Sequence, residues 1–309
     1  MRRTSRAALG VVALLVVPTG CGSENGSPGD APDALHVVAS FYPLQYVVQR
    51  IGGDRVSVAN LTPVGAEPHE IEMTASNSAS LQDADLVVYL SGFSPAVDEA
   101  VGDVAGDHAF DVSTAAQLDL TESSAGGGQV GQDSDGTRDP HFWLDPTRLA
   151  AVAGAVADQL TATDPDGAAL FAANAATLTD DLQTLDDEFR TGLAQCASTD
   201  IVTSHGAFAY LAARYGLTQV GITGLTPEDE PSPADLARVS TFVEEHGVST
   251  IYFETLVSPA IAETVAEETG ASTAVLDPLE GLSDTSAGTD YFGVMRANLA
   301  TLRRGQGCT

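Results

Sequence analysis

Three of the six histidines stand in segments that could bring imidazole groups to one shared point. They are His69 in Pro68-His69-Glu70, His141 in Pro140-His141-Phe142, and His205 in Ser204-His205-Gly206. Neutral imidazole is the commonest protein ligand for zinc. No two of the three lie within helical reach of each other, so a short metalloprotease motif such as H-E-x-x-H is absent. Tertiary folding must therefore build any shared site.

A carboxylate candidate for the same site is Asp277, in Leu276-Asp277-Pro278-Leu279. Three neutral nitrogens and one carboxylate suit zinc, whereas manganese is usually bound by more oxygen ligands. Each residue also has a simpler interpretation, because a lone histidine is more often a surface or capping residue and Asp277 before a proline is typical of a turn. The remaining histidines, His36, His108 and His246, have no comparable setting.

Apolar runs bounded by turn residues predict eight strands, four in each half of the chain. They cover residues 36–40, 56–61, 86–90, 108–112, 200–203, 218–222, 250–253 and 273–276. The runs alternate with helical stretches, which indicates parallel sheets. His69, His205 and Asp277 each follow a strand, and ligands of open parallel sheets bind at the carboxyl ends of strands.

The predicted fold class is α/β, with two similar lobes, each a mainly parallel four-stranded sheet flanked by helices. Proline at the first helical position starts a helix over 146–161, and a second helix runs from 166 to 194. At 1.5 Å per residue the second helix spans roughly 40 Å and would be a rigid link between the lobes. The predicted segments are 1–20 (signal peptide), 21–34 (flexible tether), 35–145 (N-terminal lobe), 146–195 (connecting and linking helices) and 196–309 (C-terminal lobe).

The chain begins with three arginines and an apolar run that ends shortly before Cys21. This resembles a lipoprotein signal peptide, which implies cleavage before Cys21 and acylation of its sulfur. The mature protein would then be exported and anchored by lipid to the outer face of the cytoplasmic membrane. Pro18 stands where such signals usually carry leucine, so plain secretion is the alternative.

The formal net charge is −30, and all thirteen basic residues are arginine. Such acidity argues against nucleic acid as a partner. It favours a solvated acidic surface and selects no particular metal.

Two further cysteines, Cys196 and Cys308, lie in the exported part of the chain. An oxidising compartment allows them to pair, so we expect a disulfide that pins the C-terminus to the second half of the chain. Two free thiols, or a metal site made of them, are the alternative.

The segment 121–138 is a low-complexity insertion directly before His141. Its lack of large apolar residues predicts a mobile loop. Two roles stay open for it, a lid beside the site and a tolerated surface insertion.

Six segments in one order over residues 35–305 resemble the metal-binding solute-binding proteins of ABC transporters, the zinc and manganese uptake family. The segments are Ser40-Phe41-Tyr42-Pro43-Leu44, Gly65-Ala66-Glu67-Pro68-His69-Glu70-Ile71-Glu72, Asp85-Leu86-Val87-Val88-Tyr89, Asp139-Pro140-His141-Phe142-Trp143-Leu144-Asp145-Pro146, Ser204-His205-Gly206-Ala207-Phe208-Ala209-Tyr210-Leu211 and Leu276-Asp277-Pro278-Leu279.

The resemblance implies a metal held between two lobes by His69, His141, His205 and a carboxylate, for which we predict Asp277. The third predicted ligand in chain order, His205, is a histidine, which is similar to the zinc-binding members of the family. Manganese-binding members tend to carry glutamate at this position. Two departures are visible: residues 72–76 lack a proline-rich run, and the loop before His141 lacks a histidine-rich tract.

The expected function is capture of Zn²⁺ outside the cytoplasm and its delivery to a membrane permease, without catalysis. A metallochaperone is a further candidate partner, and we expect a monomer. The rigid link predicts release by local movement, either of the Asp277 segment or of the 121–138 loop. The alternatives are a manganese-binding member of the family, an extracytoplasmic zinc hydrolase with Glu70 or Glu228 as its base, and an adhesin lipoprotein.

Overall fold

The computed structural model describes residues 34–121 and 137–309. The predicted signal peptide, Cys21, nearly all of the tether and most of the 121–138 loop lie outside the described residues. Ala31–Thr309 forms one compact unit. The predicted boundaries within it, at 145/146 and 195/196, remain predictions.

The N-terminal sheet has four strands in the order β2-β1-β3-β4, and every neighbouring pair is parallel. The strands are β1 (Leu35–Ala39), β2 (Val56–Asn60), β3 (Leu86–Tyr89) and β4 (Ala109–Asp111). The C-terminal sheet has the order β6-β5-β7-β8 and is also parallel throughout. Its strands are β5 (Asp200–Thr203), β6 (Thr218–Gly221), β7 (Thr250–Phe253) and β8 (Ser272–Val275). All eight predicted strands are confirmed, within a residue or two at their ends.

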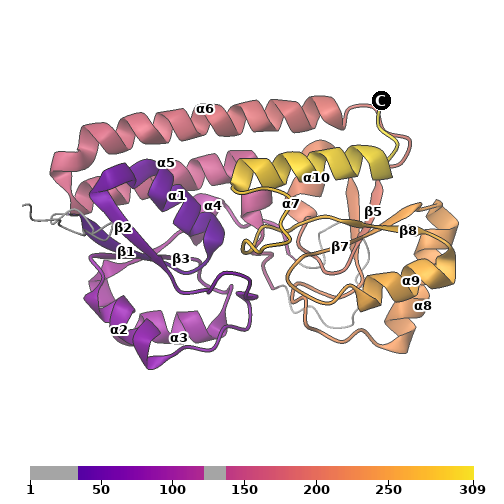
Figure 1. The fold of residues 1–309 in the computed structure, drawn as a ribbon, viewed down its shortest axis with the longest axis horizontal. Helices are drawn as coiled ribbons and strands as arrows, with labels where there is room; N and C mark the ends of the chain where they lie inside the picture. Colours follow the sequence, from indigo (N-terminus) through magenta and orange to yellow (C-terminus); the bar gives the residue numbers. More distant parts are fainter. Residues whose placement is uncertain (1–33, 122–136) are drawn as a thin grey trace, which may run out of the picture. The chain divides into compact units, whose positions relative to one another are not determined.

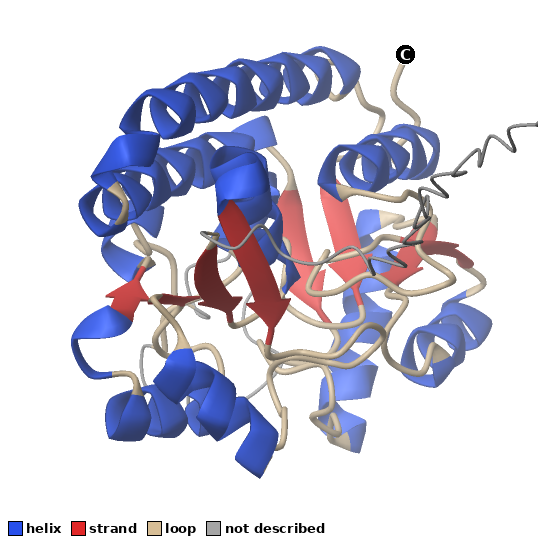
Figure 2. Cartoon of the chain, turned by 60° about the vertical axis from the view of Figure 1, so that its left-hand side comes forward, coloured by secondary structure: helices blue, strands red, loops and turns tan. Residues whose placement is uncertain are grey.

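Helices cover both sheets (Figure 2). The α-helices are α1 (Tyr42–Gly52), α2 (Ala75–Asp83), α3 (Pro95–Val104), α4 (Ser113–Ala116), α5 (Pro146–Thr163), α6 (Ala168–Gly192), α7 (Ala209–Tyr215), α8 (Pro233–His246), α9 (Ala260–Thr269) and α10 (Tyr291–Gly305). Short 3₁₀ turns are η1 (Gly53–Arg55), η2 (Gly106–His108), η4 (Phe142–Leu144) and η5 (Pro165–Gly167). No helix of the described residues is long and apolar enough to cross a bilayer.

The long helix α6 connects the two halves of the chain and is two residues shorter than predicted at each end: 165–167 form a 3₁₀ turn before it, and it ends at Gly192. It packs on α1 and α5 at one end and on α10 at the other (Figure 1). Phe171, Leu178, Leu182, Leu185 and Phe189 form its buried stripe. The predicted linking helix is therefore confirmed.

Each sheet buries one face in a shared core and the other in a core of its own. Val37 and Ile201 point into the shared core, which continues through α5, α6 and α10. Their neighbours Val38 and Val202 lie in two separate clusters. Alternate residues of a strand face opposite sides, so this pattern is expected for sheets covered on both faces. The shared core joins the two sheets to the same helices.

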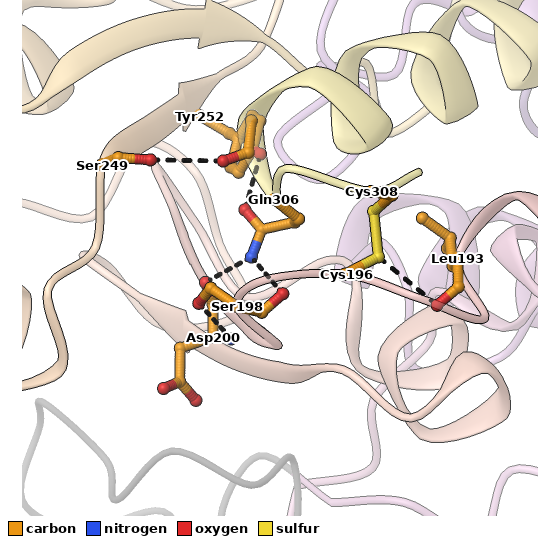
Figure 3. Close-up of a disulfide and its surroundings, with 9 residues drawn as sticks. Leu193, Cys196, Ser198, Asp200, Ser249, Tyr252, Gln306 and Cys308 are labelled. Atoms are coloured by element: carbon orange, nitrogen blue, oxygen red, sulfur yellow. Dashed lines mark hydrogen bonds between the residues drawn. A yellow bond between two sulfur atoms is a disulfide. The ribbon is translucent and has the colours of Figure 1, made fainter.

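A disulfide joins Cys196 to Cys308, as the sequence predicts (Figure 3). Beside it the Gln306 side chain donates to the carbonyls of Ser198 and Asp200 and accepts from the Tyr252 hydroxyl. Thr309 N–H donates to the Gln195 carbonyl. The C-terminus is thus fixed to the segment that leads into β5.

Candidate metal centre

His69 lies in the loop that follows β2. Its backbone N–H, like that of Glu70, donates to the carboxylate of Glu67, which folds the loop back on itself. At the start of this loop Gly65 has a φ of +80°, which favours glycine, and its N–H donates to the Leu282 carbonyl over 3.0 Å. The loop is therefore tied to the segment that follows β8, and the His69 side chain is 7% exposed.

His141 directly precedes η4 and is fully buried. Its backbone N–H donates to Asp139 Oδ1 over 2.9 Å, and its Nδ1 lies 2.8 Å from the same oxygen. A carboxylate at Nδ1 fixes the proton there and leaves Nε2 as a lone-pair donor. Trp143 packs on the His141 ring, with ring centroids 5.2 Å apart. The sequence Asp139-Pro140-His141 thus supplies both an imidazole and the group that orients it.

His205 follows β5 at the carboxyl end of the C-terminal sheet. Its Nδ1 lies 2.7 Å from Glu254 Oε1, which also accepts from the Ser204 hydroxyl over 2.9 Å. The His205 carbonyl accepts from the side chains of Thr203 and Gln219. Glu254 directly follows β7, the neighbouring strand, so the parallel topology brings the two side chains together.

Glu280 is the fourth member of the group and is completely buried. Its Oε1 lies 3.1 Å from His141 Nε2, 3.2 Å from His205 Nε2 and 3.4 Å from His69 Nε2. Within the described residues Oε2 has no hydrogen-bond partner. The potential ligand atoms of these four residues all lie within 4.8 Å of one another.

The carboxylate that the sequence analysis assigned to this group was Asp277, and the structure brings Glu280 there in its place. The Asp277 carboxylate instead accepts from the Leu279 N–H and from the Thr255 and Ser286 hydroxyls. Both acids follow β8 at the predicted end of the sheet, but the turn that starts at Asp277 directs the Glu280 side chain, three residues later, toward the imidazoles. The sequence around Glu280 contains no local signal that distinguishes it from Asp277, because the turn depends on residues distant in the chain.

The other three histidines are exposed and are not part of the group. His36 lies in β1, His108 in η2 and His246 at the end of α8. His246 Nδ1 pairs with Asp200 at 2.9 Å.

Burial and the neighbouring carboxylates shift the pKa of each group at the site. Burial lowers the pKa of His205, but Glu254 and Glu280 outweigh it and raise the value well above the ordinary one. Burial likewise lowers the pKa of His141, and Asp139 and Glu280 reverse the shift. Burial dominates at His69, whose pKa is lowered. Burial raises the pKa of Glu280, but its three imidazole neighbours bring it well below the usual range.

The Glu280 side of the site adjoins a cavity of about 320 Å³. Tyr42, Asn60 and Thr62 from the N-terminal half line it, together with Glu280 and Leu282. The four-residue group therefore lies where the loop that follows β2 meets the loop that follows β8.

The donor set has the composition that zinc prefers. Three imidazole nitrogens and one carboxylate oxygen suit a tetrahedral Zn²⁺ ion, and a site with four protein ligands leaves no position open for water.

The orienting carboxylates Asp139 and Glu254 were not identified from the sequence. Both could have been found by asking which acids lie two residues from a histidine or at the end of a neighbouring strand.

The family model described as zinc-uptake complex component A periplasmic matches residues 37–305. The chain is 37% identical over 300 residues to the high-affinity zinc uptake system protein ZnuA of Bacillus subtilis (strain 168), covering 94% of this chain and 93% of that protein. It is 35% identical over 316 residues to the zinc-binding lipoprotein AdcA of Streptococcus pneumoniae, covering 98% of this chain but only 61% of AdcA.

A solved structure of a zinc-bound protein is also similar to this chain. The Zn(II)-bound ZnuA-like domain of Streptococcus pneumoniae AdcA is 36% identical to this chain, with a TM-score of 0.72. The match covers 88% of this chain and 99% of that domain. The two-sheet architecture is therefore shared with a zinc-bound relative.

Proposed function

Because this chain belongs to the zinc-uptake complex component A family, we propose that it captures Zn²⁺ outside the cytoplasm and delivers it to an ABC permease. His69, His141, His205 and Glu280 hold the ion in this proposal. The observation that carries it is the convergence of these four buried side chains, with ligand atoms within 4.8 Å of one another. Zinc is the cargo, since the relatives are named for zinc uptake and zinc binding.

The charges of the site fit a bound dication. One carboxylate and three neutral imidazoles leave a formal charge of +1 on the liganded ion. Asp139 and Glu254, behind His141 and His205, supply two further negative charges, which bring the formal charge of the ion with its surroundings to −1. Glu280 Oε2, which lacks a partner within the described residues, is a second oxygen available to the ion.

The same geometry favours capture over catalysis. A zinc hydrolase needs an open coordination position and a general base beside it. Glu70 and Glu228, the bases considered from the sequence, are both exposed and lie outside the four-residue group. The carboxyl pKa of Glu70 is raised because Glu228 lies beside it, so the two acids interact with each other. We therefore propose a binding protein and not an enzyme.

The oxygen content of the site separates zinc from manganese. Manganese prefers sites with more carboxylate and carbonyl oxygens, and here three of four ligands are nitrogens. We expect manganese to bind more weakly than zinc.

An extracytoplasmic location is supported by the relatives, one matched family being described as periplasmic and one relative as a lipoprotein. Anchoring through acylated Cys21 is the finer proposal that goes with it. A monomeric state and a metallochaperone partner remain predictions. Incorporation of labelled fatty acid into the wild-type protein, and its absence in Cys21→Ala, tests the anchor.

The decisive experiment is metal analysis and chelator-competition zinc binding of the purified protein. The variants are His69→Ala, His141→Ala, His205→Ala and Glu280→Ala, with His246→Ala as the matched control outside the group. One tightly held zinc per chain, weakened by each of the four changes and unaffected by the control, is the expected result. No bound zinc, or equal effects of His246→Ala and His205→Ala, contradicts the proposal.

A further inference from the structure

The segment that carries Glu280 contains a backbone feature that needs an explanation. Leu279, immediately before Glu280, has a φ of +59° and is completely buried. A branched residue in the left-handed region is strained, and such strain persists only where the surroundings hold the conformation. Something therefore fixes Leu279 in this conformation, and Leu279 in turn sets the direction from which Glu280 leaves the chain.

The group that fixes it is the side chain of Asp277. Its Oδ1 accepts from the Leu279 N–H over 2.8 Å, the side-chain turn typical of aspartate two residues before a bend. Its Oδ2 accepts from the Thr255 hydroxyl over 3.2 Å and from the Ser286 hydroxyl over 3.4 Å. The carboxylate is therefore bound by three donors from three places along the chain.

The backbone around Asp277 is fixed as well. Asn298, on α10 and 2% exposed, accepts from the Asp277 N–H over 2.9 Å and donates to its carbonyl over 2.6 Å. One residue later, the Pro278 carbonyl accepts from Trp143 Nε1 over 2.7 Å. The Leu276 N–H donates to the Phe253 carbonyl over 2.9 Å, so Leu276, Asp277 and Pro278 are each bonded to another element, and Leu279 is bonded to Asp277.

We propose that Asp277 is a positioning residue for Glu280: its carboxylate holds Leu279 in the left-handed turn that places Glu280 Oε1 against the three imidazoles. Asp277 affects the metal only through Glu280 and does not coordinate it. This rests on the proposed zinc-binding function and assigns a different role to the residue that the sequence analysis took for a ligand.

The test is a double-mutant cycle on the full chain, with zinc affinity measured by chelator competition. The proteins are the wild type, Asp277→Ala, Glu280→Ala, the double variant and Asp277→Asn. Asp277→Ala should weaken zinc binding by about 10–100-fold, the usual loss for a group that supports a ligand. In the Glu280→Ala background the same change should have no further effect beyond roughly twofold, the error of additivity. Asp277→Asn keeps an oxygen for the Leu279 N–H and should stay within roughly twofold of the wild type.

Asp111→Ala is the matched control, because the Asp111 carboxylate makes a similar set of bonds to Ser91 and Ser113 but lies outside the metal group. It should lower thermal stability and leave zinc affinity unchanged. A similar loss of zinc affinity in this control would show that a structural defect alone explains the effect of Asp277→Ala.

Three results overturn the proposal. They are wild-type affinity in Asp277→Ala, a full additional loss in the double variant, and a loss in Asp277→Asn as large as in Asp277→Ala. The last two are what a direct ligand would give. If Asp277→Ala does not fold, Asp277→Asn decides the question alone. A wild-type protein that binds no zinc overturns the proposed function itself, which distinguishes that failure from a failure of the positioning role.

Discussion

The two sheets have equivalent strand orders, with β1 matching β5, β2 matching β6, β3 matching β7 and β4 matching β8. At their carboxyl ends they differ. The C-terminal sheet presents His205 after β5, Glu254 after β7, and Asp277 and Glu280 after β8. Among the described residues, the strand ends of the N-terminal sheet contribute His69 to the four-residue group, in the loop after β2.

The electrostatic surroundings differ in the same direction. His205 has Glu254 at its Nδ1 and a raised pKa, whereas burial leaves His69 with a lowered pKa. A shared topology therefore does not produce a symmetric site. His205 and His141 are each held by a buried carboxylate at Nδ1, Glu254 in the C-terminal half and Asp139 in the N-terminal half, whereas His69 lies on a loop and its ring meets no such carboxylate among the described residues. We infer that His69 is the ligand that separates first when the ion leaves.

The largest expected effect is that of His205→Ala. This change removes a ligand and leaves Glu254 and Glu280 buried without their shared imidazole. Zinc affinity should fall by more than the roughly 100-fold that marks the upper range for supporting groups. Chelator competition measures it, and the thermal midpoint of the metal-free protein checks that the variant folds.

His69→Ala should weaken zinc binding less than His205→Ala does, because no carboxylate of the described residues bonds to His69 Nδ1 and the other three ligands stay in place. The same titration gives the ratio of the two losses. Equal losses of zinc affinity, or a larger loss at His69, would contradict the expected difference between His69 and the carboxylate-supported His205.

Glu254→Gln should weaken zinc binding by about 10–100-fold, since the amide still reaches His205 Nδ1 but loses the charge that makes the imidazole a stronger donor. His205 should also lose much of its raised pKa, which an NMR titration of the metal-free protein can follow. Glu244→Gln, an exposed acid on α8, is the control.

Zinc affinity should rise with pH near neutrality by up to about tenfold per pH unit, because the ion must displace a proton from His205. The sign follows from the pKa: Glu254 and Glu280 stabilise the protonated imidazole, so its proton competes with zinc up to a pH above the ordinary histidine range. The same proton stabilises the metal-free fold at acidic pH, and this contribution is lost as the pH rises through the raised pKa. Calorimetry in buffers of different ionisation heat should count at least about one proton released per zinc, because the pKa of His141 is raised as well. A count of zero contradicts the prediction.

The smallest effect on zinc should come from removing the disulfide with Cys196→Ser and Cys308→Ser. The bridge closes a 112-residue separation, so its loss should lower the free energy of unfolding by about 2–5 kcal/mol. The metal ligands do not touch it, so zinc affinity should be unchanged. Denaturant unfolding with and without reductant measures the first quantity and chelator competition the second.

The sequence predicts the strands and the long helix because their signals are local. Apolar runs between turn residues define β1 to β8, Pro146 marks the start of α5, and the helical spacing of Leu178, Leu182, Leu185 and Phe189 defines α6. Leu170 has the same spacing in the sequence but is exposed, and Phe171 takes the buried position. The strand ends also placed His69 and His205 at the carboxyl edges of their sheets, whereas His141 follows no strand and was expected from its own segment and from the family resemblance. The disulfide followed from the oxidising compartment.

The choice between Asp277 and Glu280 was not local. Both acids follow the same strand, and only the left-handed turn at Leu279 decides which one reaches the imidazoles. That turn depends on Thr255, Ser286 and Asn298, which are distant from Asp277 in the chain. Glu254 and Asp139 occupy positions that are visible in the sequence, at a strand end and two residues before His141, but only the fold shows which ring nitrogen each of them meets.

The chain contains a single tryptophan, and its position has a practical consequence. Trp143 packs on His141 and donates its indole N–H to Pro278, between Asp277 and Glu280. A change in the position of the segment that carries Glu280, or in the charge of His141, alters the environment of the Trp143 indole, the strongly fluorescent side chain. The intrinsic tryptophan fluorescence of the unlabelled protein should therefore report whether the metal centre is assembled.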